Sequence, residues 1–238
     1  MQKEVMKKET TKAMVLPTEL QGAWGAEEAT AQDFTIPRLR LLQPLSEEVG
    51  SGEKGMGEYI KSTDKSTVAK KGEAFTFVPF LMKKFWTVFD VSQSGQPKWV
   101  RQEAWTAMND GLSWEFEEGG KKYRRDKVYS FFVIIDKDYS MKATSLPVQV
   151  NFTRSSFQTG KMLANHFATC LGEKIPPCLS KFSLESEYVN EGDKKYYVHK
   201  LKFTDLKTEM EQIKACKGWY DIVNAGKVKT EEAADDHA

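Results

Sequence analysis

The sequence predicts a mainly β domain with a barrel-like core, an extra hairpin and two peripheral helices. Strand signals dominate residues 73–152, where apolar and aromatic residues recur at the two-residue period of a strand. Residues 181–203 add a hairpin, because two strand-like runs flank the turn residues Asn190-Glu191-Gly192-Asp193. Apolar residues recur at the spacing of a helix only in residues 155–171 and 208–226. Strands and helices do not alternate along the chain, which argues against a parallel α/β sheet.

The strand segments differ in length and in burial. The basic pair Lys83-Lys84 interrupts two apolar runs, so residues 73–91 are expected to form two strands or one long bent strand. Residues 127–135 are apolar on both faces at their centre, which predicts an interior strand. Gly119-Gly120 predicts a turn. The remaining strands are expected at residues 99–105, 112–116, 146–152, 181–189 and 195–203.

Each predicted helix carries its own end signals. The first spans Ser155–Leu171, with Gly172 as the expected stop. The second begins at a Thr208-x-x-Glu211 capping box and ends at Gly226. Its expected apolar stripe consists of Met210, Ile213, Tyr220 and Val223.

Composition restricts the class of protein. The chain has 238 residues, 40% hydrophobic and 29% charged, which is a globular balance. No run approaches the roughly 18 apolar residues of a membrane span, and the first residues lack the apolar core of a secretory signal. Three cysteines are too few for a disulfide framework. We therefore expect a cytoplasmic protein without a membrane partner.

The net charge of +1 is unevenly distributed. Residues 228–238 hold one lysine and four carboxylates, a local charge of −3, so residues 1–227 carry +4. Polar residues 1–32 are expected to form a flexible arm, residues 33–226 the folded domain, and residues 227–238 an acidic tail. The tail carboxylates predicted to contact partner proteins are Glu231, Glu232, Asp235 and Asp236.

Signals for catalysis or metal binding are weak. The glycines of residues 50–55 match G-x-G-x-x-G, but a strand follows them where a dinucleotide site needs a helix. His166 and Cys170 share a helical face, yet two further metal ligands are missing. Asp136 and Asp138 could hold magnesium as in a nuclease, although acids after a strand more often form a polar turn. The sequence predicts no enzyme, cofactor or metal.

Binding signals are stronger, because cations and flat rings are interleaved, as single-stranded nucleic acid requires. Residues 121–127 alone carry five cations and one anion. Each cluster taken singly is more often a solvated hairpin end or a core ring, but several clusters in one domain favour nucleic-acid binding. The predicted binding residues are Lys83, Lys84, Trp86, Lys121, Lys122, Tyr123, Arg124, Arg125, Lys127, Tyr129, Arg154 and Lys161.

Three segments resemble a group of phage proteins. They are Ile36–Ser46, the Lys83-Lys84-x-Trp86 run after a Phe-rich strand, and the strand-to-helix junction Asn151–Lys161. The chain is similar over residues 33–226 to phage single-stranded DNA-binding, helix-destabilising proteins with an oligonucleotide-binding barrel. The resemblance implies a five-stranded barrel, a role in replication or recombination, and an acidic tail for partner proteins. This tail ends in Ala238, where many proteins of that function carry a terminal aromatic residue.

We therefore expect non-catalytic, largely sequence-independent binding and protection of single-stranded DNA, with replication or recombination proteins docking on the tail. One alternative is a phage protein-interaction module, such as a host-defence inhibitor or a recombinase loader. Another is a metal-dependent nuclease. The sequence leaves open whether the chain forms a homo-oligomer.

Overall fold

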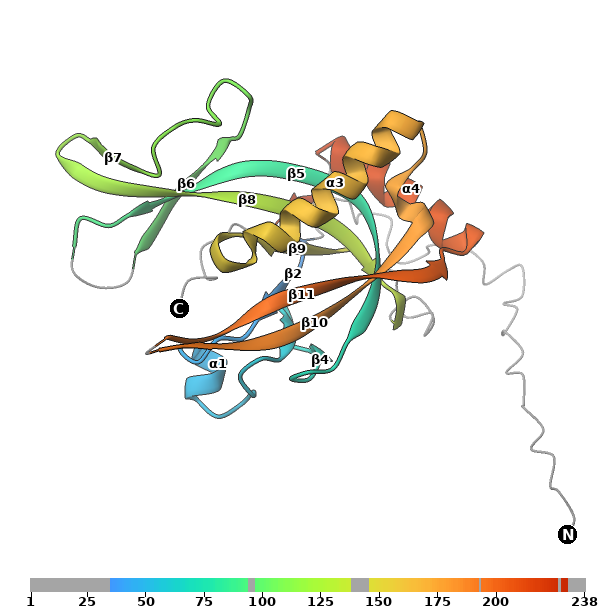
Figure 1. Ribbon diagram of the computed structural model, residues 1–238, viewed down its shortest axis with the longest axis horizontal. Coiled ribbons are helices and arrows are strands. Elements are labelled where there is room, and N and C mark those ends of the chain that lie inside the picture. Colours follow the sequence, from blue (N-terminus) through green and yellow to red (C-terminus); the bar gives the residue numbers. More distant parts are fainter. Residues whose placement is uncertain (1–34, 94–96, 138–145, 193, 227, 231–238) are drawn as a thin grey trace, which may run out of the picture. The chain divides into compact units, whose positions relative to one another are not determined.

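The computed structural model describes residues 35–93, 97–137, 146–192, 194–226 and 228–230 (Figure 1). The predicted arm and the four tail carboxylates lie outside these residues. The strands are β1 (Thr35–Ile36), β2 (Arg38–Leu41), β3 (Tyr59–Lys61), β4 (Thr67–Ala69), β5 (Phe75–Asp90), β6 (Lys98–Ala104), β7 (Glu115–Glu118), β8 (Lys121–Ile135), β9 (Val148–Phe152), β10 (Ser180–Glu191), β11 (Lys194–Lys207) and β12 (Lys229–Thr230). The α-helices are α1 (Glu47–Gly50), α3 (Phe157–Glu173) and α4 (Met210–Asn224), with 3-10 turns η3 (Arg154–Ser156) and η4 (Pro177–Leu179).

The mainly β class is confirmed, but the predicted closed five-stranded barrel is wrong. Within the described residues, ten strands form one open, mixed sheet in the order β11-β10-β5-β8-β9-β2-β3-β4, with β6 added to β5 and β7 added to β8. Only β2 and β9 run parallel in it. The predicted long bent strand is β5, which has a register shift between Pro79 and Leu81.

Two strands, β5 and β8, are longer than their neighbours and extend the sheet beyond its curled part. β5 and β8 pair continuously from Phe77↔Ile135 to Asp90↔Tyr123. Their inner halves lie between β10 and β9, whereas their outer halves pair with β6 and β7. We call β6, β7, residues 83–90 of β5 and residues 121–128 of β8 the extension, and the rest of the sheet with its helices the body (Figure 1).

The body of the sheet is nevertheless curled. The side-chain amide of Gln43 donates to the carbonyl of Tyr197 and accepts from its N–H, each at 2.9 Å. This amide replaces a strand neighbour for β11 and links that edge of the sheet to the chain after β2. The Tyr59 hydroxyl donates to the carbonyl of Glu185 at 3.1 Å and supports the same curl.

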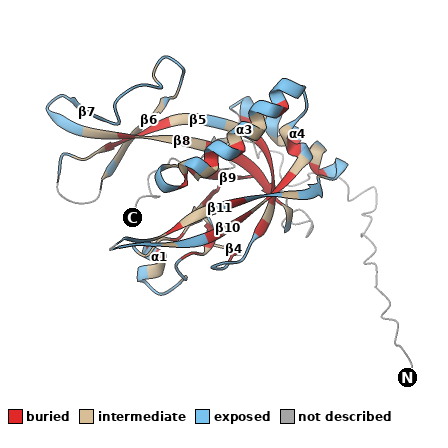
Figure 2. Cartoon of the chain, viewed as in Figure 1, coloured by how far each residue is buried: buried red, intermediate tan, exposed pale blue. Residues whose placement is uncertain are grey.

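Both faces of the inner strands are covered, which confirms that residues 127–135 form an interior strand. One face packs Phe131, Phe152 and Phe182 against α3 residues such as Leu163. The other packs Phe132 and its neighbours against α4. Figure 2 shows buried residues along these inner strands, while β7 at the outer end is exposed. Burial on two faces explains the continuous apolar run in the sequence.

The helices lie close to their predicted positions, and three details differ. α3 continues through Gly172 to Glu173, and Lys174 takes the left-handed capping conformation, with φ of 56°. The capping box of α4 consists of Glu209 and Gln212, not Thr208 and Glu211.

The third difference is the apolar stripe of α4. Met210 and Tyr220 are exposed, and the buried face of the helix carries Gln212, Cys216 and Val223. Gln212 is buried because it donates to the carboxylate of Asp136 at 2.6 Å, which turns the helix from its expected orientation. In the parts of the chain described, no helix is long and apolar enough to cross a membrane.

Candidate nucleic-acid interface

The pairing of β5 with β8 decides which predicted residues share a face of the extension. Directly opposed residues of an antiparallel pair project to the same side. Lys84 opposes Tyr129, and Trp86 opposes Lys127. Arg125 lies two positions before Lys127, so it projects to the same side. We call this side of the extension the cationic face.

A second tryptophan links the rings of the cationic face. Trp105, just after β6, has its ring centroid 6.0 Å from that of Trp86 and 5.1 Å from that of Tyr129. Phe157, at the start of α3, lies 5.1 Å from Tyr129. The Nζ of Lys127 lies 5.0 Å from the Trp105 centroid. Cations and aromatic rings therefore alternate across this surface, in the mixture that backbone and base contacts require.

The loop after β6 holds these rings in place. The indole N–H of Trp105 donates to Asp110 at 2.6 Å, and the Lys127 ammonium contacts the same carboxylate oxygen at 2.7 Å. The hydrogen bond from Lys127, and to a lesser extent that from Trp105, lowers the pKa of Asp110. Trp86 donates to Asn109 at 3.3 Å. The Trp86 ring is only 2% exposed, so it supports the face from below.

A groove of about 450 Å³ lies beside these residues. Three of its lining residues are cations (Arg125, Lys127 and Arg154), and one is the acid Asp126. Trp114 lines it as well and is 60% exposed, unlike Trp86. The groove is also lined by Trp86, Leu112, Ser113 and Phe157.

The groove follows a gap in the edge of β8. β7 pairs with residues 121–124 and β9 with residues 129–133, so neither strand covers the segment between them. In that segment the Arg125 N–H donates to the carbonyl of Trp114 at 2.7 Å, which anchors the tryptophan loop to the edge. Arg125 and Lys127 both line the groove beside this gap, although Arg125 is only 9% exposed.

Arg154 reaches the groove from the junction of β9 and α3. Its Nε donates to Asp126 at 2.7 Å, and its guanidinium lies 5.8 Å from the Phe89 centroid. Its backbone has φ of 46°, a left-handed conformation that costs a non-glycine residue about 1 kcal/mol or more. Asp126 thus holds the Arg154 head group against the extension.

The structure brings six of the predicted residues together, namely Lys84, Trp86, Arg125, Lys127, Tyr129 and Arg154. Tyr123 lies further out on the same face, stacked on Phe116 at 5.3 Å. Lys83 and Arg124 project to the other side, over the rings of Phe132 and Phe89. Lys121 and Lys122 lie at the outer turn, and Lys161 is exposed on α3.

Trp105, Trp114 and Phe157 are not among the binding residues that the sequence predicts. The two tryptophans fall in short predicted strands, and Phe157 falls in the first predicted helix. Both tryptophans flank the polar loop of Asn109 and Asp110. A tryptophan at each end of a polar loop was the signal available for them.

The residues of the rival hypotheses have other contacts. Asp136 accepts from Lys181 at 2.7 Å and from Gln212 at 2.6 Å. Asp138 lies outside the described residues. Cys170 Sγ lies 3.4 Å from His166 Nε2, so these two side chains do adjoin. Among the residues that the structure describes, no three His, Cys, Asp or Glu side chains cluster as metal ligands would.

Comparison with known proteins places the chain in a phage family. The model of the Pam3 phage gp34-like proteins matches residues 6–229, which is nearly the whole chain. The chain therefore belongs to the Pam3 phage gp34-like family. No curated protein and no solved structure matches it.

Proposed function

We propose that this phage protein binds single-stranded DNA without catalysis, in the groove beside the cationic face. The observation that carries the proposal is the meeting of two accessible cations, Lys127 and Arg154, with the exposed ring of Trp114 in one groove, which the buried Arg125 also lines. Cations neutralise the phosphates, and a flat exposed ring accepts an unpaired base. This combination favours single strands, because the base faces of a duplex are already stacked.

The proposed contacts are not sequence-specific. The groove offers ammonium and guanidinium groups to phosphates and aromatic faces to bases, and every base has a face that can stack. A protein of this kind covers and protects exposed strands, which fits the replication or recombination role that the phage resemblance implies. We propose the acidic tail, including Glu231 and Asp235, as the docking segment for partner proteins of that process.

The nuclease alternative has less support. Asp136 is engaged by Lys181 and Gln212 in contacts that join β8, β10 and α4. Those contacts stabilise the body and use the carboxylate that a metal ion would need. The protein-interaction alternative predicts binding that is directed at a protein and survives moderate salt.

The test is a binding titration with labelled oligothymidylate of about 16 nucleotides and a duplex of equal length, with and without magnesium. We expect the single strand to bind far more tightly than the duplex and to remain intact in magnesium. Two phosphate contacts, at Lys127 and Arg154, predict that log K falls with log salt with a slope of about −1.4, from about −0.7 per contact.

Trp114→Ala is the informative variant, because its ring is 60% exposed and its removal leaves the core intact. Loss of one stacked base predicts about 1–3 kcal/mol weaker binding. Met108→Ala is the matched control, since Met108 is 99% exposed in the same loop and does not line the groove. Equal binding by both variants, equal affinity for duplex, or degradation in magnesium would each refute the proposal.

A further inference from the structure

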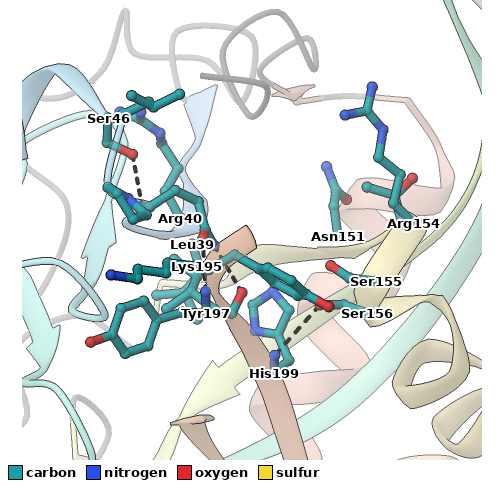
Figure 3. Close-up of a pocket in the computed structure, with 16 residues that line it drawn as sticks. Leu39, Arg40, Ser46, Asn151, Arg154, Ser155, Ser156, Lys195, Tyr197 and His199 are labelled. Carbon is teal, nitrogen blue, oxygen red and sulfur yellow. Dashed lines mark hydrogen bonds between the residues drawn. The ribbon is translucent and has the colours of Figure 1, made fainter. Parts of the chain in front are cut away.

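A second cavity, of about 330 Å³, lies beyond Arg154. Its walls come from the chain around the end of β2, from the junction of β9 and α3, and from β11. Figure 3 shows Arg40 with Ser46 on one side and Asn151 with Arg154 on the other. Two of the segments that carried the phage resemblance, Ile36–Ser46 and Asn151–Lys161, thus meet in this cavity.

The walls suit an anionic, partly flat ligand. None of the residues lining this cavity is acidic, whereas Arg40, Arg154 and Lys195 are cationic. The guanidinium of Arg40 already forms an ion pair, because its Nη1 lies 2.8 Å from the Glu48 carboxylate. Lys195 is exposed on β11, next to the half-buried ring of Tyr196. The cavity therefore combines positive charge with an aromatic ring, as the groove does.

One hydroxyl in the cavity wall is left unsatisfied. The Oγ1 of Thr153 is buried and has no hydrogen-bond partner among the described residues. A buried hydroxyl without a partner costs about as much as a lost hydrogen bond. Thr153 immediately precedes Arg154, so this hydroxyl belongs to the same strand-to-helix junction.

Arg154 belongs to both cavities. Its guanidinium is fixed by Asp126 at 2.7 Å and by a left-handed backbone. The two hollows therefore adjoin at this residue.

We infer that a bound single strand continues past Arg154 into the second cavity, where Lys195 neutralises a phosphate. The inference rests on the proposed function and extends it. It predicts that the protein occludes more nucleotides than the groove alone can hold.

The test compares Lys195→Gln with Lys194→Gln on oligothymidylates of about 4 and about 16 nucleotides, the range of site sizes for one small binding domain. Both lysines are exposed neighbours at the start of β11, but only Lys195 lines the cavity. One lost phosphate contact predicts about fivefold weaker binding of the long oligomer by Lys195→Gln at about 0.1 M salt, with a salt slope shallower by about 0.7. The short oligomer, held in the groove, should bind the two variants equally.

Equal affinity of both variants for the long oligomer, with wild-type binding intact, would overturn the second subsite and leave the groove proposal standing. A loss by Lys195→Gln that is the same for both lengths would also overturn it, because the short strand would then already occupy the cavity. Failure of the wild-type protein to bind either oligomer would overturn both proposals together.

Discussion

The body and the extension use the same residue types for opposite purposes. In the body, rings pack on rings, as for Phe131 and Phe152 at 5.7 Å, beneath helices on both faces. In the extension, rings pack against cations, as for Phe116 with the Arg125 guanidinium at 4.0 Å. The difference follows from what covers the sheet. Where a helix covers a face, aromatic residues pack on one another, and where none does, cations cover them, as Arg124 covers the buried ring of Phe89.

The largest expected effect is a difference in unfolding free energy between a variant of the body and a variant of the extension. Phe131→Ala removes a fully buried ring of the body and should cost about 3–5 kcal/mol of unfolding free energy. Trp114→Ala, in the extension, should change it by less than about 1 kcal/mol, because the ring is mostly exposed. Urea denaturation of both variants measures this. A comparable loss from both would mean that the extension folds as part of the core.

Protonation of His199 should affect the body. Burial lowers the pKa of His199 to about 4, and its Nδ1 lies 3.0 Å from the Tyr59 hydroxyl. Between pH 6.5 and 4, His199 is protonated in the unfolded chain but stays neutral in the folded chain. The free energy of unfolding therefore decreases as the pH falls. The loss should reach about 3 kcal/mol. His199→Gln, measured by denaturation at several pH values, should remove this pH-dependent loss; an unchanged profile would assign it to other groups.

The contact between α3 and the sheet offers a third test. A Cβ on Gly160 would lie 2.5 Å from the Phe152 Cβ, whereas one on Gly172 would meet nothing within 4 Å. Gly160→Ala should therefore destabilise the protein by about 1–3 kcal/mol, and Gly172→Ala in the same helix should stabilise it by about 0.5–1 kcal/mol. Thermal unfolding compares them. Stabilisation by both substitutions would show that α3 lies further from β9.

The smallest effect sharpens the comparison between the two faces of the extension. Lys127→Gln removes a groove cation, and Lys83→Gln removes a cation from the other side. Only the first should make the salt slope of DNA binding shallower, by about 0.7. Salt titrations of the two variants provide the measurement. Equal changes in slope would mean that DNA contacts both faces.

Sequence alone predicted the elements better than their assembly. The long strand β5, the interior strand β8, the β10–β11 hairpin and both long helices followed from periodicity and turn residues. The barrel did not, because alternation tells which side chains share a face but not how far two strands pair. The open sheet depends on the continuous pairing of β5 with β8, which no local pattern encodes.

The candidate site was predictable in part for a similar reason. Adjacent strand residues point to opposite faces, so Lys83-Lys84 and Arg124-Arg125 could each supply only one cation to a given surface. The sequence alone therefore indicates that each basic pair places one cation on each face of the sheet. The approach of Arg154 from the β9–α3 junction was not available, because it depends on the tertiary contact with Asp126.

The most direct test of the central claim is a map of backbone amide shifts on adding oligothymidylate to the full chain. If cations and rings converge on a groove that a single strand enters, the shifted amides should cluster at residues 112–114, 125–127 and 154–157. Amides of α4, on the opposite side of the sheet, should stay unchanged. Shifts concentrated on α4, or scattered over both faces, would contradict the account.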